Sequence, residues 1–185
     1  FIQRFPIFYE SMEADMSLSL LPKIIARELP EITPALLWQK RIRLLMLDFD
    51  NTIVPYTTNV PTEKMEAWLE SMKNTGIQLC IVSNSRRDRV KKFCAAHGLD
   101  CITHAKKPFA KGIRECLQKY GIPASQAALV GDQIYTDTLG ANCQGVTSIL
   151  VSAINNHNIW LKARHVLELP FIAMAKNRRI EYEKS

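Results

Sequence analysis

The sequence lacks the features of membrane-spanning and secreted proteins. No stretch approaches the roughly 20 consecutive apolar residues that a transmembrane helix needs. The first ten residues, FIQRFPIFYE, have neither the apolar core nor the small-residue cleavage site of a signal peptide. Internal repeats and low-complexity tracts are absent. With 47% apolar and 23% charged residues among 185, the composition is that of one globular domain with a hydrophobic core.

Cysteine is scarce and scattered. The five cysteines are odd in number, and no two of them form a CxxC pair. Both facts argue against a disulfide framework and a zinc site, and they favour a reducing compartment, the cytoplasm. We expect most of these thiols to be small buried hydrophobes.

Neither sign of charge dominates. The chain has 24 Lys and Arg residues against 18 Asp and Glu, which gives a net charge of +6. A solvated surface explains a surplus of this size more often than a partner does, although phosphates or an anionic membrane would also suit it. We expect no nucleic-acid partner.

Residues 1–40 form an apolar segment that Pro22, Pro30 and Pro34 divide into short helical pieces. We favour packing of this segment on the domain's own core; the alternative is that it lies on a membrane or a partner. Residues 41–170 are expected to form the main domain, and 171–185 a polar, basic tail.

A regular alternation of strands and helices begins at Arg43. Apolar runs predict strands, and apolar faces with a helical period predict helices. We expect strands over 43–49, 77–82, 100–104, 127–131 and 146–151, and helices over 62–75, 86–97, 109–120, 136–143 and 157–168. This order implies βαβ units with right-handed crossovers, so the predicted fold class is α/β: a Rossmann-like parallel sheet flanked by helices.

Polar side chains follow several of these strands. The run LLMLDFDNTI ends in Asp48 and Asp50, while Ser83, Lys107 and Asp132 each follow a later strand. Because the carboxyl ends of parallel strands meet at one edge of a sheet, we expect these residues to lie together. Turns, a helix cap and surface charges could explain each residue singly, but hardly all of them jointly.

Such a group suits phosphoryl chemistry. Asp48 and Asp132 can bind Mg²⁺ through oxygen. Asp48 can also act as a nucleophile, and Asp50 as the acid and base that serves it. Ser83 can hydrogen-bond a phosphate oxygen, and Lys107 can offset the charge of the transition state.

These residues resemble the four motifs of the haloacid dehalogenase-like (HAD) phosphatases. They occur in the family's order, over about residues 43–150, as Asp48-Phe-Asp50-Asn-Thr52, Ser83, Lys107 before Pro108, and Gly131-Asp132 followed by Asp137. The lysine could also be the adjacent Lys106; only the Lys-Pro order favours Lys107.

The resemblance implies a HAD-like fold and a set of roles. Asp48 would be the nucleophile and Asp50 the general acid/base. Mg²⁺ would be bound by Asp48, Asp132 and the backbone carbonyl of Asp50. The resemblance also implies that Ser83 and Asn84 bind the phosphate. Asp137 and Thr52 would support the residues that contact the metal and the substrate.

The spacing of the motifs leaves no room for a cap domain. Only one helix and one strand fit between Thr52 and Ser83, and again between Ser85 and Lys107. We therefore expect an open site. It would suit a phosphate on a large or membrane-held molecule, or a site that a second subunit of an oligomer closes.

The finer pattern is similar to the YqeG-type branch of HAD subfamily IIIA. The stretches that carry this likeness are DFDNTIVPY, VSNS, AKKP and GDQIYTDTLGAN. That branch is related to the mitochondrial phosphatidylglycerophosphate phosphatases. The resemblance therefore implies a lipid head group as substrate, dephosphorylation of phosphatidylglycerophosphate, and peripheral contact with the inner face of a membrane.

Two other functions remain open at this stage. One is a soluble phosphatase for small sugar or nucleotide phosphates. The other is a non-catalytic module that uses the fold to bind a partner. The complete set of aspartates argues against the module, because a degenerate copy of the family usually loses Asp48 or Asp50.

Overall fold

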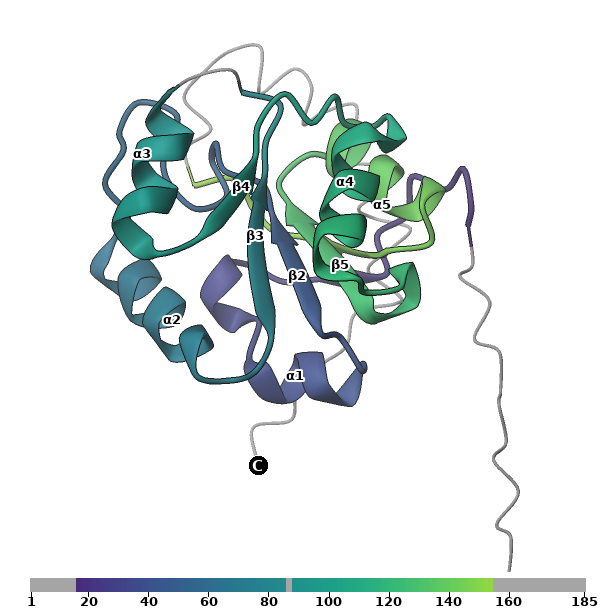
Figure 1. Ribbon diagram of the computed structural model, residues 1–185, viewed down its shortest axis with the longest axis horizontal. Coiled ribbons are helices and arrows are strands. Elements are labelled where there is room, and N and C mark those ends of the chain that lie inside the picture. The colour runs from purple at the N-terminus through teal and green to yellow at the C-terminus, as the bar shows by residue number, and fades with distance from the viewer. Residues whose placement is uncertain (1–15, 86–87, 155–185) are drawn as a thin grey trace, which may run out of the picture.

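A single parallel sheet organises the computed structural model, which describes residues 16–85 and 88–154 (Figure 1). The strand order is β1-β6-β5-β2-β3-β4, and every pairing is parallel. The strands are β1 (Ile24–Ile25), β2 (Leu44–Leu47), β3 (Gln78–Val82), β4 (Asp100–Ile102), β5 (Ala127–Gly131) and β6 (Thr147–Leu150). The α/β fold class predicted from the sequence, a Rossmann-like parallel sheet flanked by helices, is confirmed.

Helices cover both faces of the sheet, as Figure 1 shows. They are α1 (Pro34–Gln39), α2 (Glu63–Lys73), α3 (Asp88–His97), α4 (Ala110–Tyr120) and α5 (Leu139–Cys143). Side chains alternate along β2: Leu45 and Leu47 join a core that includes α2 and α3, whereas Leu44 and Met46 join a second core beneath α4 and α5. A strand buried on both faces explains the continuous apolar run in its sequence.

The described part of the N-terminal segment contributes to this fold. Ile24 and Ile25 pair with β6, and Leu29, Ile32 and two leucines of α1 are buried in the larger core. The strand lies where short helical pieces were predicted. Two residues are too few to show a period of two, and the pairing depends on the open edge of β6, which lies 125 residues away.

Most other predicted elements appear close to their predicted bounds. The prediction over 136–143 differs most, because a π-helical turn (Ile134–Thr138) precedes α5. The predicted helix over 157–168 and the tail over 171–185 lie outside the described residues. None of the helices within the described ranges is long and apolar enough to cross a membrane.

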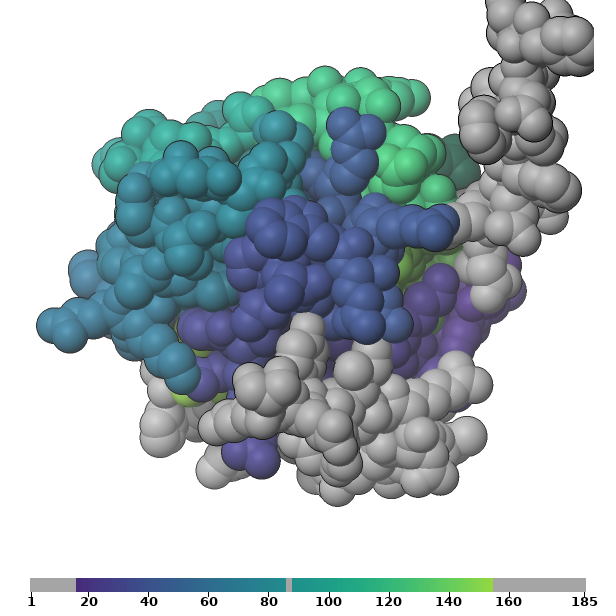
Figure 2. Space-filling view, turned by 90° about the horizontal axis from the view of Figure 1, so that it is seen from below, coloured from purple at the N-terminus to yellow at the C-terminus, as the bar shows by residue number. Residues whose placement is uncertain are grey.

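The order of the strands places the site. β2 lies between β3 and β5, and the chain leaves β2 toward one side of the sheet and later returns on the other. Loops after β2, β3, β4 and β5 therefore emerge at one carboxyl edge, beside the switch point where open α/β sheets bind ligands. α1 lies at the opposite edge, and the surface on that side includes the purple and blue residues of the N-terminal part (Figure 2).

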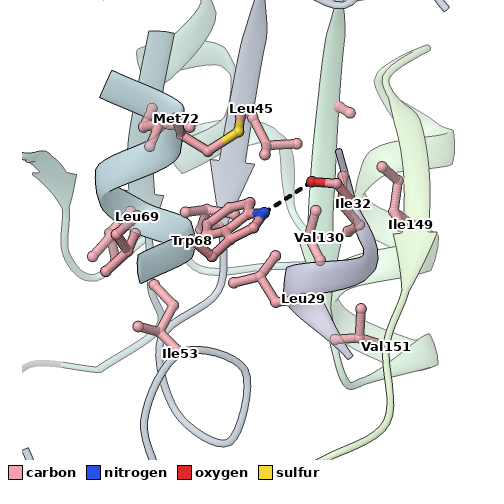
Figure 3. Packing of buried hydrophobic residues seen from close by; sticks show 14 of the residues in the cluster. Leu29, Ile32, Leu45, Ile53, Trp68, Leu69, Met72, Val130, Ile149 and Val151 are labelled. Atoms are coloured by element: carbon pink, nitrogen blue, oxygen red, sulfur yellow. Dashed lines mark hydrogen bonds between the residues drawn. The ribbon is translucent and has the colours of Figure 1, made fainter. Parts of the chain in front are cut away.

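The hydrogen bond of Trp68 joins α2 to the N-terminal segment. Its indole N–H donates to the Ile32 carbonyl over 2.9 Å inside the core (Figure 3). Trp68→Phe should lower the free energy of unfolding in urea by about 1–3 kcal/mol, because a buried carbonyl loses its donor. Trp38→Phe is the matched control: Trp38 is 57% exposed, so a change within about 0.5 kcal/mol is expected. Equal losses in both variants would contradict this account.

Candidate active site

Asp48 stands at the end of the central strand β2. Its backbone N–H continues the sheet by donating to the Val130 carbonyl over 2.8 Å. Its carboxylate Oδ1 accepts a hydrogen bond from the Lys107 Nζ over 2.6 Å. Both residues are buried, so this ion pair is shielded from water.

Lys107 lies between two carboxylates. Its Nζ is 2.6 Å from Asp48 Oδ1 and 2.7 Å from Asp137 Oδ1, and its side chain is only 1% exposed. The backbone of Lys107 is held by the side chain of Asn84, which accepts from its N–H over 2.7 Å and donates to its carbonyl over 2.9 Å. The neighbouring Lys106 is exposed. The structure therefore brings Lys107, and not Lys106, to Asp48.

Asp137 reaches the site from the π-helical turn after β5. Its Oδ2 accepts a hydrogen bond from the Gln133 N–H over 3.2 Å, which fixes the carboxylate against the end of β5. A Cβ atom added to Gly131 would lie 2.2 Å from Asp137 Oδ2, so only glycine permits this approach. The glycine before Asp132 is thus a packing requirement of the site.

Gly112 has a corresponding role on α4. A Cβ there would come within 2.5 Å of the Ala105 Cα. The absent side chain lets α4 pack directly against the loop that presents Lys107.

Three carboxylates gather around the end of β5. Asp48, Asp132 and Asp137 offer oxygen atoms that all lie within 4.8 Å of one another. Asp132 Oδ1 is buried and has no hydrogen-bond partner among residues 16–85 and 88–154. Three acids face the single ammonium of Lys107, and an orphaned carboxylate oxygen points to a missing positive partner. This all-oxygen set fits a hard divalent cation such as Mg²⁺.

The pKa values of these groups reflect the same crowding. Burial, followed by the charges of Asp48 and Asp137, raises the pKa of Asp132 to about 8. Burial also raises the pKa of Asp48 to about 6, although Lys107 opposes the rise. Burial alone would lower the pKa of Lys107, but the carboxylates of Asp137 and Asp48 outweigh it and hold the pKa above its ordinary value. The lysine is therefore charged at neutral pH.

Asp50 makes a different contact from the other aspartates. Arg89, on the first turn of α3, donates from Nη2 to Asp50 Oδ1 over 2.5 Å. Asn51 turns the chain here with a positive φ of 62°, which asparagine tolerates better than most residues. Sequence reasoning missed Arg89, which lies 39 residues from its partner. The sequence indicated only that the predicted helix over 86–97, which includes Arg89, is basic.

Ser83 and Thr52 are buried at the same edge of the sheet. Ser83 Oγ accepts a hydrogen bond from the Ser85 N–H over 3.1 Å, which leaves the hydroxyl proton available for an acceptor. Thr52 Oγ1 is buried and has no hydrogen-bond partner within the described chain. The predicted site residues thus all lie at the carboxyl edge, where cation, phosphate and nucleophile could meet.

Comparison with known proteins agrees with this geometry. Residues 55–151 match the family pattern of haloacid dehalogenase-like hydrolases. Over 166 residues the chain is 30% identical to the probable phosphatase YqeG of Bacillus subtilis (strain 168), covering 89% of the chain and 96% of that protein.

A more distant relative is chloroplastic phosphatidylglycerophosphate phosphatase 1 of Chlamydomonas reinhardtii. It is 25% identical over 157 residues, which are 80% of the chain but only 58% of that protein.

Solved structures show the same fold at low identity. One is 3-deoxy-D-manno-octulosonate 8-phosphate phosphatase from Yersinia pestis, with a TM-score of 0.51 at 16% identity over 77% of the chain and 86% of its own. Another is a hypothetical protein from Xanthomonas campestris, with a TM-score of 0.51 at 18% identity over 75% and 79%. Motif order, site geometry and these relatives lead to one conclusion: the chain belongs to the haloacid dehalogenase-like hydrolase family and is a phosphatase.

Proposed function

We propose that this phosphatase works through an aspartyl-phosphate formed on Asp48. The observation that carries the proposal is the Asp48 carboxylate, held 2.6 Å from Lys107 beside a cluster of acids that suits a cation. A carboxylate oxygen of Asp48 attacks phosphorus while the bond to the leaving oxygen breaks, and Asp50 gives that oxygen a proton. Asp50 then takes a proton from water, which attacks phosphorus and frees Asp48 and inorganic phosphate.

Mg²⁺ is the proposed cofactor, held by Asp48, Asp132 and the backbone carbonyl of Asp50. When bound, it supplies positive charge that offsets repulsion between the phosphate and the attacking carboxylate. Asp137 has a supporting role: its carboxylate pairs with Lys107 and keeps the ammonium beside Asp48.

Ser83 is proposed to donate its hydroxyl proton to a phosphate oxygen. Both polar side-chain atoms of Asn84 are already bonded to the Lys107 backbone, so its proposed contact with phosphate falls to its backbone N–H. Thr52 remains a supporting residue whose buried hydroxyl lies in the turn after Asp50.

We further propose a lipid phosphate, phosphatidylglycerophosphate, as the substrate. The relative from Chlamydomonas reinhardtii, which is named as a phosphatidylglycerophosphate phosphatase, supports this choice. The uncapped carboxyl edge supports it as well, because a large head group needs access. Phe109 and Val60 follow site strands and are 73% and 74% exposed, which suits peripheral contact with a membrane from the cytoplasmic side. The net charge of +6 suits an anionic surface.

Removing the nucleophile or its acid/base partner tests the mechanism. Asp48→Asn should reduce Mg²⁺-dependent turnover to background, and Asp50→Asn should lower it by about 10²–10⁴-fold, the range of a lost acid/base. Turnover is measured by phosphate release. Asp88→Asn is the matched control, since Asp88 is exposed on the first turn of α3 and should leave turnover unchanged. Near-native turnover in either site variant would refute the mechanism.

The raised pKa of Asp132 predicts a conflict between stability and cation binding. The contribution of a carboxyl with a raised pKa to stability is fully present below pH 3.8 and is lost as pH rises toward about 8. Asp132→Asn should therefore melt higher than the wild type without metal, with a gap that grows over this range to about 4 °C or more. Mg²⁺ should raise the melting temperature of the wild type only.

Two outcomes for Asp132→Asn would contradict this prediction. A gap that does not depend on pH, or equal stabilisation of both proteins by Mg²⁺, would contradict this view of the cluster. Asp88→Asn again serves as control, because Asp88 is exposed and lies outside the cluster.

Substrate choice needs a separate measurement. Turnover of phosphatidylglycerophosphate in mixed micelles should exceed that of a panel of soluble sugar and nucleotide monophosphates at equal concentration. The reason is that an uncapped site has little surface with which to bind a small substrate. A strong preference for a soluble member would reject the lipid proposal and leave the mechanism standing.

A further inference from the structure

Arg89 is fixed on several sides at the mouth of the site. Besides its bond to Asp50, Nη1 donates to the Tyr56 carbonyl over 2.7 Å. The guanidinium lies over the ring of Phe49, with its carbon 5.0 Å from the ring centroid. Phe49 is fully buried and packs edge-on against Phe93 of α3. The side chain of Arg89 is only 11% exposed and that of Asp50 19%, so their contact is largely shielded from water.

The guanidinium of Arg89 bonds to one carboxylate oxygen of Asp50 and not to the other. Its bond goes to Oδ1, and Oδ2 has no hydrogen bond to any residue within 16–85 and 88–154. The carboxyl torsion of aspartate is broad, so an unsupported Asp50 would sample many directions. A planar guanidinium that is itself bound to a carbonyl and a ring removes this freedom.

We propose that Arg89 is a positioning residue for proton transfer: it holds Oδ1 of Asp50 so that Oδ2 faces the leaving oxygen. This inference rests on the role proposed for Asp50. Because Oδ1 is occupied by the bond from Arg89, Oδ2 is the oxygen that carries the transferred proton. That proton moves to the leaving oxygen as the phosphorus–oxygen bond breaks. A proton from the attacking water returns to Oδ2 in the second step.

A purely structural role is the competing explanation. Arg89 ties α3 to the segment after Asp50 through the carbonyls of Pro55 and Tyr56. If that tie were its only purpose, loss of Arg89 would disturb every step of the reaction alike. If Arg89 orients Asp50, the damage should depend on how much the leaving group needs a proton.

The test compares two phosphomonoesters in rapid-mixing experiments on the full chain with Mg²⁺. A nitrophenol leaves without a proton, whereas glycerol, a primary alcohol, needs one. With nitrophenyl phosphate, Arg89→Ala should release one nitrophenolate per active site at a nearly native rate and then turn over slowly, because the second step also needs Asp50. With glycerol phosphate, leaving-group release itself should slow by about 10²-fold or more.

Three comparison variants sharpen the result. Arg89→Lys should recover part of the loss, because an ammonium can pair with Asp50 but cannot also bridge to Tyr56 in the same plane. It also serves if Arg89→Ala fails to fold. Arg114→Ala removes an exposed arginine of α4 that, within the described residues, bonds only to Gln144, and it should behave as the wild type. Asp50→Asn should reproduce the leaving-group dependence of Arg89→Ala.

Each other outcome overturns the inference. Equal slowing of both esters would assign Arg89 a structural role, and native rates with both would assign it none in the reaction. The result for Asp48→Asn distinguishes a failure of the proposed mechanism from a failure of the role proposed for Arg89. If that variant keeps turnover, the proposed mechanism fails; if it is inactive while Arg89→Ala treats both esters alike, only the role of Arg89 fails.

Discussion

The buried ammonium of Lys107 is the interaction on which the site depends. A charged lysine with an almost inaccessible side chain is tolerated only where opposite charge surrounds it, and Asp48 and Asp137 provide that charge. The three residues come from the loops after β4, β2 and β5, so the ion pairs also fix how these loops meet. The site therefore cannot be separated from the packing of the sheet: each strand end must arrive in register for the lysine to be neutralised.

Close backbone approach completes this arrangement. Gly131 lets Asp137 lie against β5, and Gly112 lets α4 lie against the loop of Lys107. The π-helical turn after β5 contains Asp137, and such turns often occur at functional sites. The charged groups therefore meet because two glycines allow close backbone approach and because one turn is irregular. They do not depend on flexible side chains that extend toward one another.

The fold and the main residues of the candidate site could be predicted from the sequence because both predictions depend on local patterns. The apolar run of β2 and the aspartates that end it are contiguous, and parallel topology then places the other strand ends beside them. Three features depended on distant contacts and were not predictable in this way. They are the pairing of the two-residue β1, the bond of Arg89 to Asp50, and the use of the Asn84 amide to hold the Lys107 backbone. Helix and strand propensity and hydrophobic periodicity carry no information about contacts between distant residues.

The path of the chain before β2 bears on how the protein can be shortened. The Ser17 N–H bonds to the Asn142 carbonyl, β1 lies at the edge of the sheet, and the chain then passes over one face to enter the centre at β2. Residues 17–40 thus act as a strap that ties the outermost strand to the central one. A truncation at residue 40 would strip Leu29, Ile32 and the leucines of α1 from the core and expose the edge of β6. An active fragment has to retain this strap, even though every predicted catalytic residue follows it.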